Sequence, residues 1–142
     1  MTNLENVSKA IGDVEEKFDD LLCEVSRAGD TIGGIVRCVV TGLPAGLGEP
    51  VFDKADALLA QAILSIGAVK GIEFGNGFDI CDMTGSDSND SMHKDSSSGK
   101  PVFDTNNAGG ILGGITRGDD IVFRAAVKPV PSIFIEQNTV DS

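Results

Sequence analysis

The sequence predicts an α+β fold in which helices pack on one face of a small antiparallel sheet. Two stretches carry apolar residues at the three- and four-residue spacing of an amphipathic helix, and three others alternate side chains as strands do. The order helix, strand, helix, strand, strand favours antiparallel pairing with the helices on one side of the sheet. With 142 residues the chain has the length of one domain, and we expect residues 1–142 to form it.

The first helix is expected over the opening residues, because their apolar side chains recur at steps of three and four. They form one stripe: Leu4, Val7, Ile11, Val14, Phe18, Leu21, Leu22 and Val25. Thr2 and Glu5 have the spacing of a capping box, and Gly29 is a suitable stop. Acidic residues surround the stripe, so we interpret this helix as packing on a core with a solvated acidic face.

A strand, a shaped loop and a second helix are expected next. Residues 35–40 alternate between two faces, as a strand does, and the loop GLPAGLGEP (42–50) follows with closely spaced glycines and prolines. Asp53 is placed to cap a second helix. The expected buried side of that helix consists of Leu58, Leu59, Ala62, Ile63 and Ile66.

Two more strands are expected, AVKGIEF (68–74) and DIVFRAAVKP (120–129), the second ending at Pro129 and Pro131. The second of these has one apolar face and one face turned to solvent or a ligand. Between the two strands, residues 84–101 are rich in Ser and Asp and nearly free of apolar side chains. Such a segment buries too little surface to offset its ordering entropy, so we expect a mobile polar loop that folding does not need.

Composition excludes several classes of function. The net charge of −11 and the absence of Tyr and Trp argue against a nucleic-acid surface, which needs basic stripes and stacking platforms. No apolar run approaches the roughly 18 residues of a membrane span, and the amino terminus does not resemble a signal peptide. Three widely spaced cysteines are typical of reduced thiols. We therefore expect a cytoplasmic protein with no nucleic-acid or membrane partner.

Familiar site motifs are also missing. GGILGG is not G-x-G-x-x-G, no P-loop occurs, and one histidine with three scattered cysteines cannot form a zinc site. That histidine, His93, lies in the polar loop, where we expect it to be exposed and without a catalytic role. KPVPS (128–132) suits a phosphate, with an amine at Lys128 and a hydroxyl at Ser132. Read alone this signal is weak, because a strand that ends in proline is common.

The stretch TNNAGGILGG (105–114) places four glycines around two apolar residues. Each glycine inside regular structure costs about 0.5–1 kcal/mol relative to alanine. Either the backbone needs positive φ here, or another surface approaches more closely than a Cβ would allow.

Two long stretches of the chain resemble the chorismate synthase family. They are GDTIGGIVRCVVTGLPAGLGEPVFDKADALLAQAILSIGAVKGIEFGNGFD (29–79) and TNNAGGILGGITRGDDIVFRAAVKPVPSI (105–133), with weaker similarity over the first helix and at QNTVD. The family's fold is a β-α-β sandwich with helices between antiparallel sheets, and its members form homotetramers. The resemblance implies the 1,4-elimination of phosphate from 5-enolpyruvylshikimate 3-phosphate to give chorismate, a step in aromatic amino acid biosynthesis.

The family requires reduced FMN, and the resemblance implies FMN contacts at matching positions of this chain. These positions are Gly67, Ala68, Gly113, Lys128, Pro129, Val130, Pro131 and Ser132. Many members have asparagine where Gly67 stands. By the same resemblance, the GGILGG backbone passes close against the flavin, and Gly113 lacks a side chain because one would occupy the cofactor's space. The alternative, that the glycines only shape a turn, stays open for Gly109 and Gly110.

Several family motifs are absent from this sequence. They are the amino-terminal histidine motif, the R-P-G-H-A-D segment, the flavin-binding serine/arginine region and the R-H-D-P segment with its active-site aspartate. We therefore assign no catalytic residue and no metal ligand. We expect a fragment that lacks turnover and, with half of the flavin contacts missing, binds FMN on its own too weakly for routine detection. The alternative is a non-catalytic module that self-associates, or a degenerate paralogue.

Overall fold

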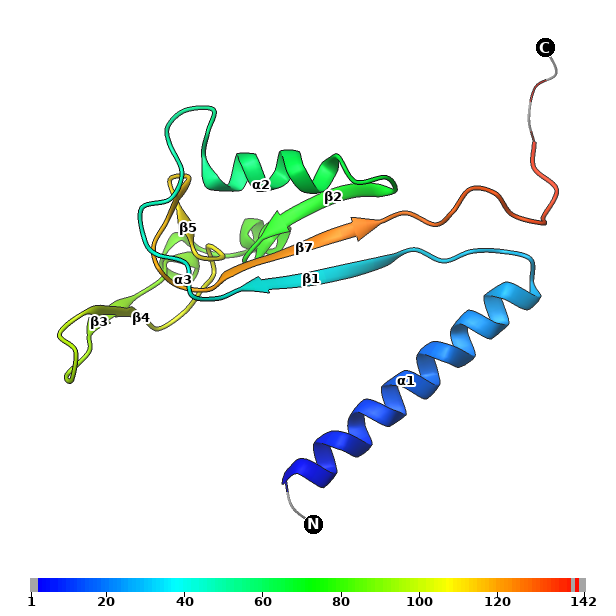
Figure 1. Cartoon of the computed structure of the whole chain (residues 1–142), viewed down its shortest axis with the longest axis horizontal. Helices are drawn as coiled ribbons and strands as arrows, with labels where there is room; N and C mark the ends of the chain where they lie inside the picture. Colours follow the sequence, from blue (N-terminus) through cyan, green and yellow to red (C-terminus); the bar gives the residue numbers. More distant parts are fainter. Residues whose placement is uncertain (1–2, 139, 141–142) are drawn as a thin grey trace. The chain divides into compact units, whose positions relative to one another are not determined.

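The structure of the chain is a computed structural model that describes residues 3–138 and 140, with side chains from Val14 onward in the first helix. The chain divides into two compact units, Gly34–Val127 and a second made of Met1–Gly33 with Lys128–Ser142. Figure 1 shows the course of the chain through both units. Each unit is described by itself below.

The larger unit is built on a three-stranded antiparallel sheet (Figure 1). Its strands are β1 (Gly34–Val40), β7 (Ile121–Val127) and β2 (Val69–Phe74), in the order β1-β7-β2. Phe123 of β7 lies opposite Cys38 on one side and Phe74 on the other. The last strand along the chain is thus the central one. The three strands expected from sequence, and the α+β class, are confirmed.

The core lies on the face of the sheet that carries Ile121, Phe123 and Ala125, all of them buried. The Phe74 and Phe123 rings pack with centroids 5.8 Å apart, an arrangement in the range that favours aromatic pairs. The alternation of β7 matches the sequence, since its buried residues are every second one.

Helix α2 (Ala55–Leu64) covers this face, but two expectations about it are wrong. Lys54, not Asp53, is its N-cap residue, and no side chain caps the helix. The Ala55 amide instead donates to the Gly114 carbonyl at 2.8 Å, so a distant backbone group satisfies the helix start.

The buried stripe of α2 agrees with the expected one only in part, at Leu59 and Ile63. Ala55, Leu59 and Ile63 pack on the core at steps of four residues. Leu58 and Ile66, which were expected to be buried, are exposed by 45% and 55%, and the expected Ala62 is exposed too. The helix is apolar on both sides, so its sequence does not reveal which stripe meets the sheet.

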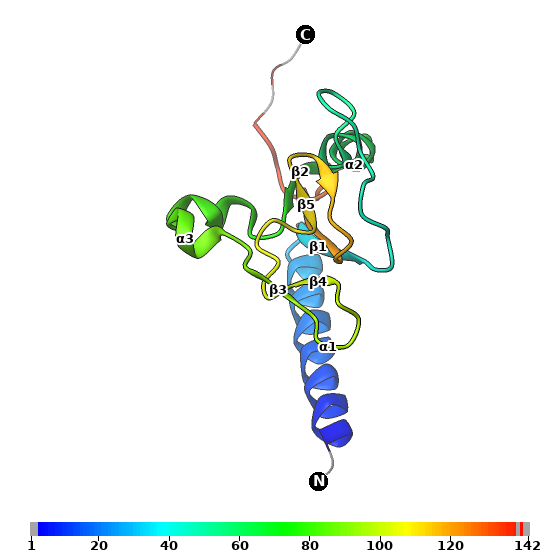
Figure 2. The ribbon, with the colours of Figure 1, turned by 90° about the vertical axis from the view of Figure 1, so that its left-hand side faces the viewer.

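The rest of the larger unit consists of short elements that the sequence did not predict. They are η1 (Gly77–Asp82), α3 (Gly85–Ser88), the hairpin β3 (Met92–Lys94) with β4 (Pro101–Phe103), and the hairpin β5 (Ile111–Leu112) with β6 (Ile115–Thr116). Helices α2 and α3 lie on different sides of the strands (Figure 2). Residues 84–101 thus contain a helical turn and most of a hairpin. Their mobility stays a prediction.

The smaller unit contains α1 (Asn3–Arg27), which confirms the helix expected there. The helix stops before Gly29, whose φ of +74° is the left-handed conformation of a helix C-terminus. The Gly29 carbonyl accepts a hydrogen bond from the Phe134 amide at 2.8 Å. The expected cap residue Thr2 lies outside the described residues.

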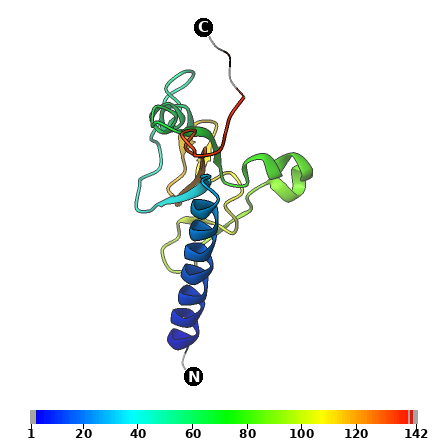
Figure 3. The same ribbon diagram turned by 90° about the vertical axis from the view of Figure 1, so that its right-hand side faces the viewer.

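The apolar stripe of α1 is open over its described part. Val14 and Phe18 are exposed by 65% and 58%, and Leu21 by 41%. Packing of this stripe on a core, as expected from the sequence, is not found within the helix's own unit. Figure 3 shows α1 from end to end. No helix among the described residues is long and apolar enough to cross a membrane.

Candidate functional site

The glycine-rich segment forms a tight hairpin. Gly113 and Gly114 link β5 to β6, with φ values of +59° and +88°. A two-residue hairpin loop with positive φ at both positions is a type I′ turn, which favours glycine and asparagine. Gly109 and Gly110 also have positive φ, +66° and +82°. All four glycines of the segment are therefore explained in part by backbone conformation.

Close approach within the chain explains three of these glycines further. A Cβ on Gly109 would lie 2.7 Å from the Val122 carbonyl oxygen and would also meet the amide nitrogen of Gly75. A Cβ on Gly110 would lie 2.5 Å from the Asp120 carbonyl oxygen. At Gly114 it would meet the side chain of Lys54.

Gly113 is different, because a Cβ there would have no heavy atom within 4 Å. Its side-chain direction points away from the chain into open space. The turn therefore presents bare backbone to whatever lies outside. Such a surface suits the close approach of a flat ligand.

Gly67 and Ala68 lie between α2 and β2. A Cβ on Gly67 would also meet open space. Ala68 has φ of +72° and is the one non-glycine residue with positive φ among those described. Such a conformation costs an alanine about 1–2 kcal/mol. Backbone strain of this kind is concentrated at functional sites. The conformation of Ala68 therefore makes it a candidate site residue on structural grounds alone.

The structure places these residues at two ends of α2. Gly114 accepts the hydrogen bond from the first residue of the helix, Ala55, whereas Gly67 and Ala68 follow its last turn. A helix of ten residues is about 15 Å long. Gly113 is thus separated from Gly67 and Ala68 by roughly the length of α2.

Residues 128–132 belong to the smaller unit and follow the end of β7. The Val130 carbonyl accepts a hydrogen bond from the Thr31 hydroxyl at 2.6 Å. Lys128 and Ser132 are exposed and form no ion pair or side-chain hydrogen bond with the described residues. Their amine and hydroxyl are free to hold an anionic group.

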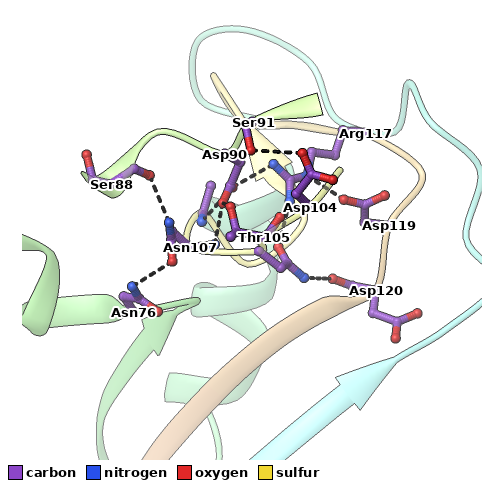
Figure 4. Close-up of polar contacts among 12 residues, drawn as sticks. Asn76, Ser88, Asp90, Ser91, Asp104, Thr105, Asn107, Arg117, Asp119 and Asp120 are labelled. Carbon is purple, nitrogen blue, oxygen red and sulfur yellow. Dashed lines mark hydrogen bonds and ion pairs between the residues drawn. The ribbon is translucent and has the colours of Figure 1, made fainter. Parts of the chain in front are cut away.

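A buried ion pair that the sequence did not reveal, between Asp90 and Arg117, lies beside Thr105 and Asn107 at the start of the glycine segment (Figure 4). Arg117 Nη1 donates to Asp90 Oδ2 at 2.6 Å, and the two side chains are 6% and 2% exposed. Asp90 also accepts from the amides of Asn107 at 2.7 Å and Ala108 at 3.1 Å, and from the Thr105 hydroxyl at 2.7 Å.

The pKa of Asp90 is lowered from its ordinary value. Burial by itself raises this pKa, but the hydrogen bonds from Thr105, Asn107, Ala108 and Arg117 outweigh burial and favour the carboxylate. Asp90 lies in the polar stretch 84–101, so this charge fixes that stretch to the residues that precede the hairpin. The partners are 27 positions apart in the sequence, and no periodicity links them.

His93 lies on the surface of the larger unit, in hydrogen-bond contact with Asp104. Its Nδ1 lies 2.7 Å from Asp104 Oδ1, and the two side chains are 57% and 45% exposed. The pKa of Asp104 is lowered by the hydrogen bond from Ser91 and then by His93. Among the residues that the structure describes, no cluster of His, Cys, Asp and Glu could hold a metal ion.

The open face of the sheet carries a second polar feature. Arg37 of β1 and Arg124 of β7 are register partners, and both line a cavity of about 290 Å³. Glu73 Oε1 pairs with Arg124 at 2.6 Å, and Asp79 lies 3.7 Å from it. Glu73 and Asp79 thus compensate the charge of Arg124. Arg37 forms no ion pair with the described residues.

The fold described here is a mixed helix-and-sheet assembly with antiparallel strands and a glycine hairpin at one end of its covering helix. Residues 2–142 match the family model for chorismate synthase. The chain belongs to the chorismate synthase family. Its similarity to individual proteins of known name extends over nearly its whole length.

Two relatives illustrate the match. A chorismate synthase from Nitratidesulfovibrio vulgaris (strain DP4) is 58% identical over 129 residues, which cover 91% of this chain and 35% of that protein. One from Acetivibrio thermocellus is 54% identical over 129 residues, 89% of this chain and 33% of that protein. A crystal structure of chorismate synthase superposes with a TM-score of 0.77 at 37% identity, covering 82% of this chain and 35% of the other. The chain spans about a third of the length of these relatives.

Proposed function

We propose that this chain is part of a chorismate synthase, a lyase of the shikimate pathway. The reaction would convert 5-enolpyruvylshikimate 3-phosphate to chorismate and phosphate by a 1,4-elimination, in which the substrate loses a proton and its phosphate with no net redox change. The observation that carries the proposal is the family match over residues 2–142, supported by relatives at 51–58% identity.

We also propose that the chain supplies part of an FMN site. The residues are Gly67, Ala68, Gly113, Lys128, Pro129, Val130, Pro131 and Ser132. Reduced FMN, when bound, would lend an electron to the substrate and recover it. The open space beyond Gly113 and the left-handed backbone of Ala68 support this proposal, because both features suit a ligand that lies directly on the backbone.

The residues of this chain would bind and orient the cofactor. The Lys128 amine and the Ser132 hydroxyl suit its phosphate, through charge-assisted and neutral hydrogen bonds. Gly113 leaves room for a ring system that a side chain would displace.

Proton transfer is not assigned to any residue here. General acid–base catalysis needs a group within hydrogen-bond reach of the substrate and with a suitable pKa. The one histidine of the chain is paired with Asp104 on the surface. The family also implies a homo-oligomer in the cytoplasm, and we carry both over as predictions.

A non-catalytic, self-associating module is the second candidate. Its support is the exposed apolar side chains of Leu58 in α2 and Ile66 just after the helix, which are uncovered within their unit. Apolar groups gathered on one face seek partners. A module of this kind would associate with copies of itself without converting a substrate.

A segment exchange separates the two candidates. We would replace the 129 matching residues of the Nitratidesulfovibrio vulgaris relative with those of this chain, and assay chorismate formation anaerobically with reduced FMN. The chimera should turn over within about tenfold of the parent, because the exchanged segments are 58% identical. The chain alone should show no turnover above a control without protein. A folded chimera that binds no FMN and makes no chorismate would favour the non-catalytic module.

A further inference from the structure

Thr116 lies at the end of the glycine hairpin and is buried, with 4% of its surface exposed. Its hydroxyl donates to the Pro44 carbonyl at 2.8 Å and accepts from the Leu47 amide at 2.9 Å. Both capacities of the buried hydroxyl are therefore used. The partners lie 72 and 69 positions away in the sequence, in the loop between β1 and α2.

Backbone hydrogen bonds of Thr116 join the hairpin to the same loop. The Gly46 amide donates to the Thr116 carbonyl at 2.8 Å, and the Thr116 amide donates to the Leu47 carbonyl at 2.9 Å. On its other side β6 pairs with β5, where Ile111 is the register partner of Thr116. The loop residues 44–47 thus flank the hairpin much as a further strand would.

The same loop also reaches the turn of the hairpin. A Cβ on Gly48 would lie 2.9 Å from the Ala55 amide nitrogen and would meet the Gly114 carbonyl oxygen. These are the two groups whose hydrogen bond begins α2. Loop, hairpin turn and helix start are therefore in backbone contact, and Thr116 contributes the only side-chain hydrogen bonds between loop residues 44–48 and the hairpin among the described residues.

We propose that Thr116 is a positioning residue for the cofactor surface at Gly113. This inference rests on the proposed function. Thr116 does not contact the cofactor; it holds the loop 44–48 against the hairpin so that the Gly113 backbone keeps one position. A binding group must be held within about 0.5 Å to be effective, and buried hydrogen bonds behind it provide that rigidity. Without the hydroxyl, the Leu47 amide and the Pro44 carbonyl lose a buried partner, which favours release of the loop.

The test compares Thr116→Val, which keeps the shape of the side chain, with Thr116→Ser, which keeps the hydroxyl. Thr41→Val is the matched control, because Thr41 is exposed and makes no side-chain hydrogen bond with the described residues. Amide hydrogen exchange in the 142-residue chain is read by NMR at Gly46, Leu47 and Gly114. We expect exchange at least tenfold faster in Thr116→Val, near wild-type rates in Thr116→Ser, and no change in the control.

The second measurement is titration of the same variants with FMN to millimolar concentration, followed through amide shifts. The apparent FMN affinity read from the Gly113 amide shift should fall at least tenfold in Thr116→Val and return to the wild-type value in Thr116→Ser. The affinity read from the Ala68 shift should stay the same in both variants. Unchanged exchange in Thr116→Val, or equal losses at Gly113 and Ala68, would overturn the positioning role. A wild-type chain that shows no FMN-dependent shift would contradict the proposed function instead, and exchange would then decide the role of Thr116.

Discussion

Single residues of the glycine segment are glycine for different reasons. Gly109, Gly110 and Gly114 are closely surrounded by the chain's own atoms, and Gly113 is not. The sequence suggested that positive φ or close approach was required here, and the structure contains both. Flavin contact at Gly113 stays a prediction, because its φ of +59° would by itself select glycine or asparagine.

Substituting asparagine for Gly113 distinguishes the two reasons for glycine there, the positive φ of the backbone and the proposed contact with the flavin. Gly113→Asn creates an Asn-Gly pair, the preferred type I′ turn, so the hairpin should keep its stability. In the segment-exchange chimera we expect its melting temperature to change by at most a few degrees, and its FMN affinity, measured by flavin fluorescence, to fall at least tenfold. Normal FMN binding by a folded Gly113→Asn chimera would mean that the glycine serves only the turn.

Gly113→Val is the contrasting variant, because a β-branched residue is poorly suited to positive φ. It should lose stability and FMN binding together. Equal melting temperatures for Gly113→Asn and Gly113→Val would show that backbone conformation does not restrict which residue can occupy position 113.

Asp90 carries the largest expected effect on stability. Asp90→Asn removes the more buried of the two carboxylates that pair with Arg117, the other being Asp119 at 2.9 Å. Breaking a buried pair costs up to about 3–5 kcal/mol. Asp104→Asn is the control, because its pair with His93 is exposed and exposed pairs contribute little to stability. Urea unfolding of both variants measures the difference. Equal losses would mean that the Asp90 pair is not the anchor we describe.

The pH dependence follows from the lowered pKa of Asp90. A carboxyl whose pKa is lower in the folded than in the unfolded state stabilises the fold above its unfolded pKa, about 3.9, and loses that contribution as the pH falls through the folded pKa. Wild type should therefore lose stability more steeply than Asp90→Asn as the pH falls below the unfolded pKa of about 3.9. Parallel curves for the two proteins would contradict the assignment.

At the scale of secondary structure, the long elements could be predicted and the short ones could not. Helix α1 and strands β1, β2 and β7 have enough residues to show a period. Strands of two or three residues, such as β5 and β6, show none, and their pairing depends on the turn between them. The start of α2 was mispredicted because its first amide bonds to Gly114, a contact across about 60 residues that no local cap signals.

The polar stretch 84–101 is held by local hydrogen bonds at its hairpin tip and by distant contacts at Asp90. Its hairpin tip, residues 95–100, is exposed apart from Asp95 and is held by local bonds, from the Ser97 and Ser98 amides to Asp95. Replacing this six-residue tip with Asn-Gly should shift the melting temperature by only a few degrees, since each halving of a loop changes its closure free energy by only about 0.6 kcal/mol. A replacement that removes Asp90 should be far more damaging. A large loss from the tip alone would show that the tip packs on the unit.

At the scale of the whole molecule, the exposed side chains of Leu58 in α2 and Ile66 just after it predict self-association. Sedimentation at roughly tens of micromolar should detect oligomers, a range that tests a modest interface. Leu58→Asp with Ile66→Asp should shift the chain toward monomer, because a charge in an apolar interface is left unpaired. A matched pair on a polar surface, Ser86→Asp with Ser96→Asp, should have no such effect. A wild-type chain that sediments only as monomer would count against the prediction.

The most direct test of the central claim is a residue-by-residue map of FMN binding to the chain. Amide shifts of the 142-residue protein would be recorded with FMN to millimolar concentration, a range suited to a partial site, and with inorganic phosphate as control. We expect FMN-dependent amide shifts at Gly67, Ala68, Gly113 and residues 128–132, and phosphate-dependent shifts only at residues 128–132. Shifts confined to other surfaces, such as the cavity between Arg37 and Arg124, or no shift at all, would contradict this claim.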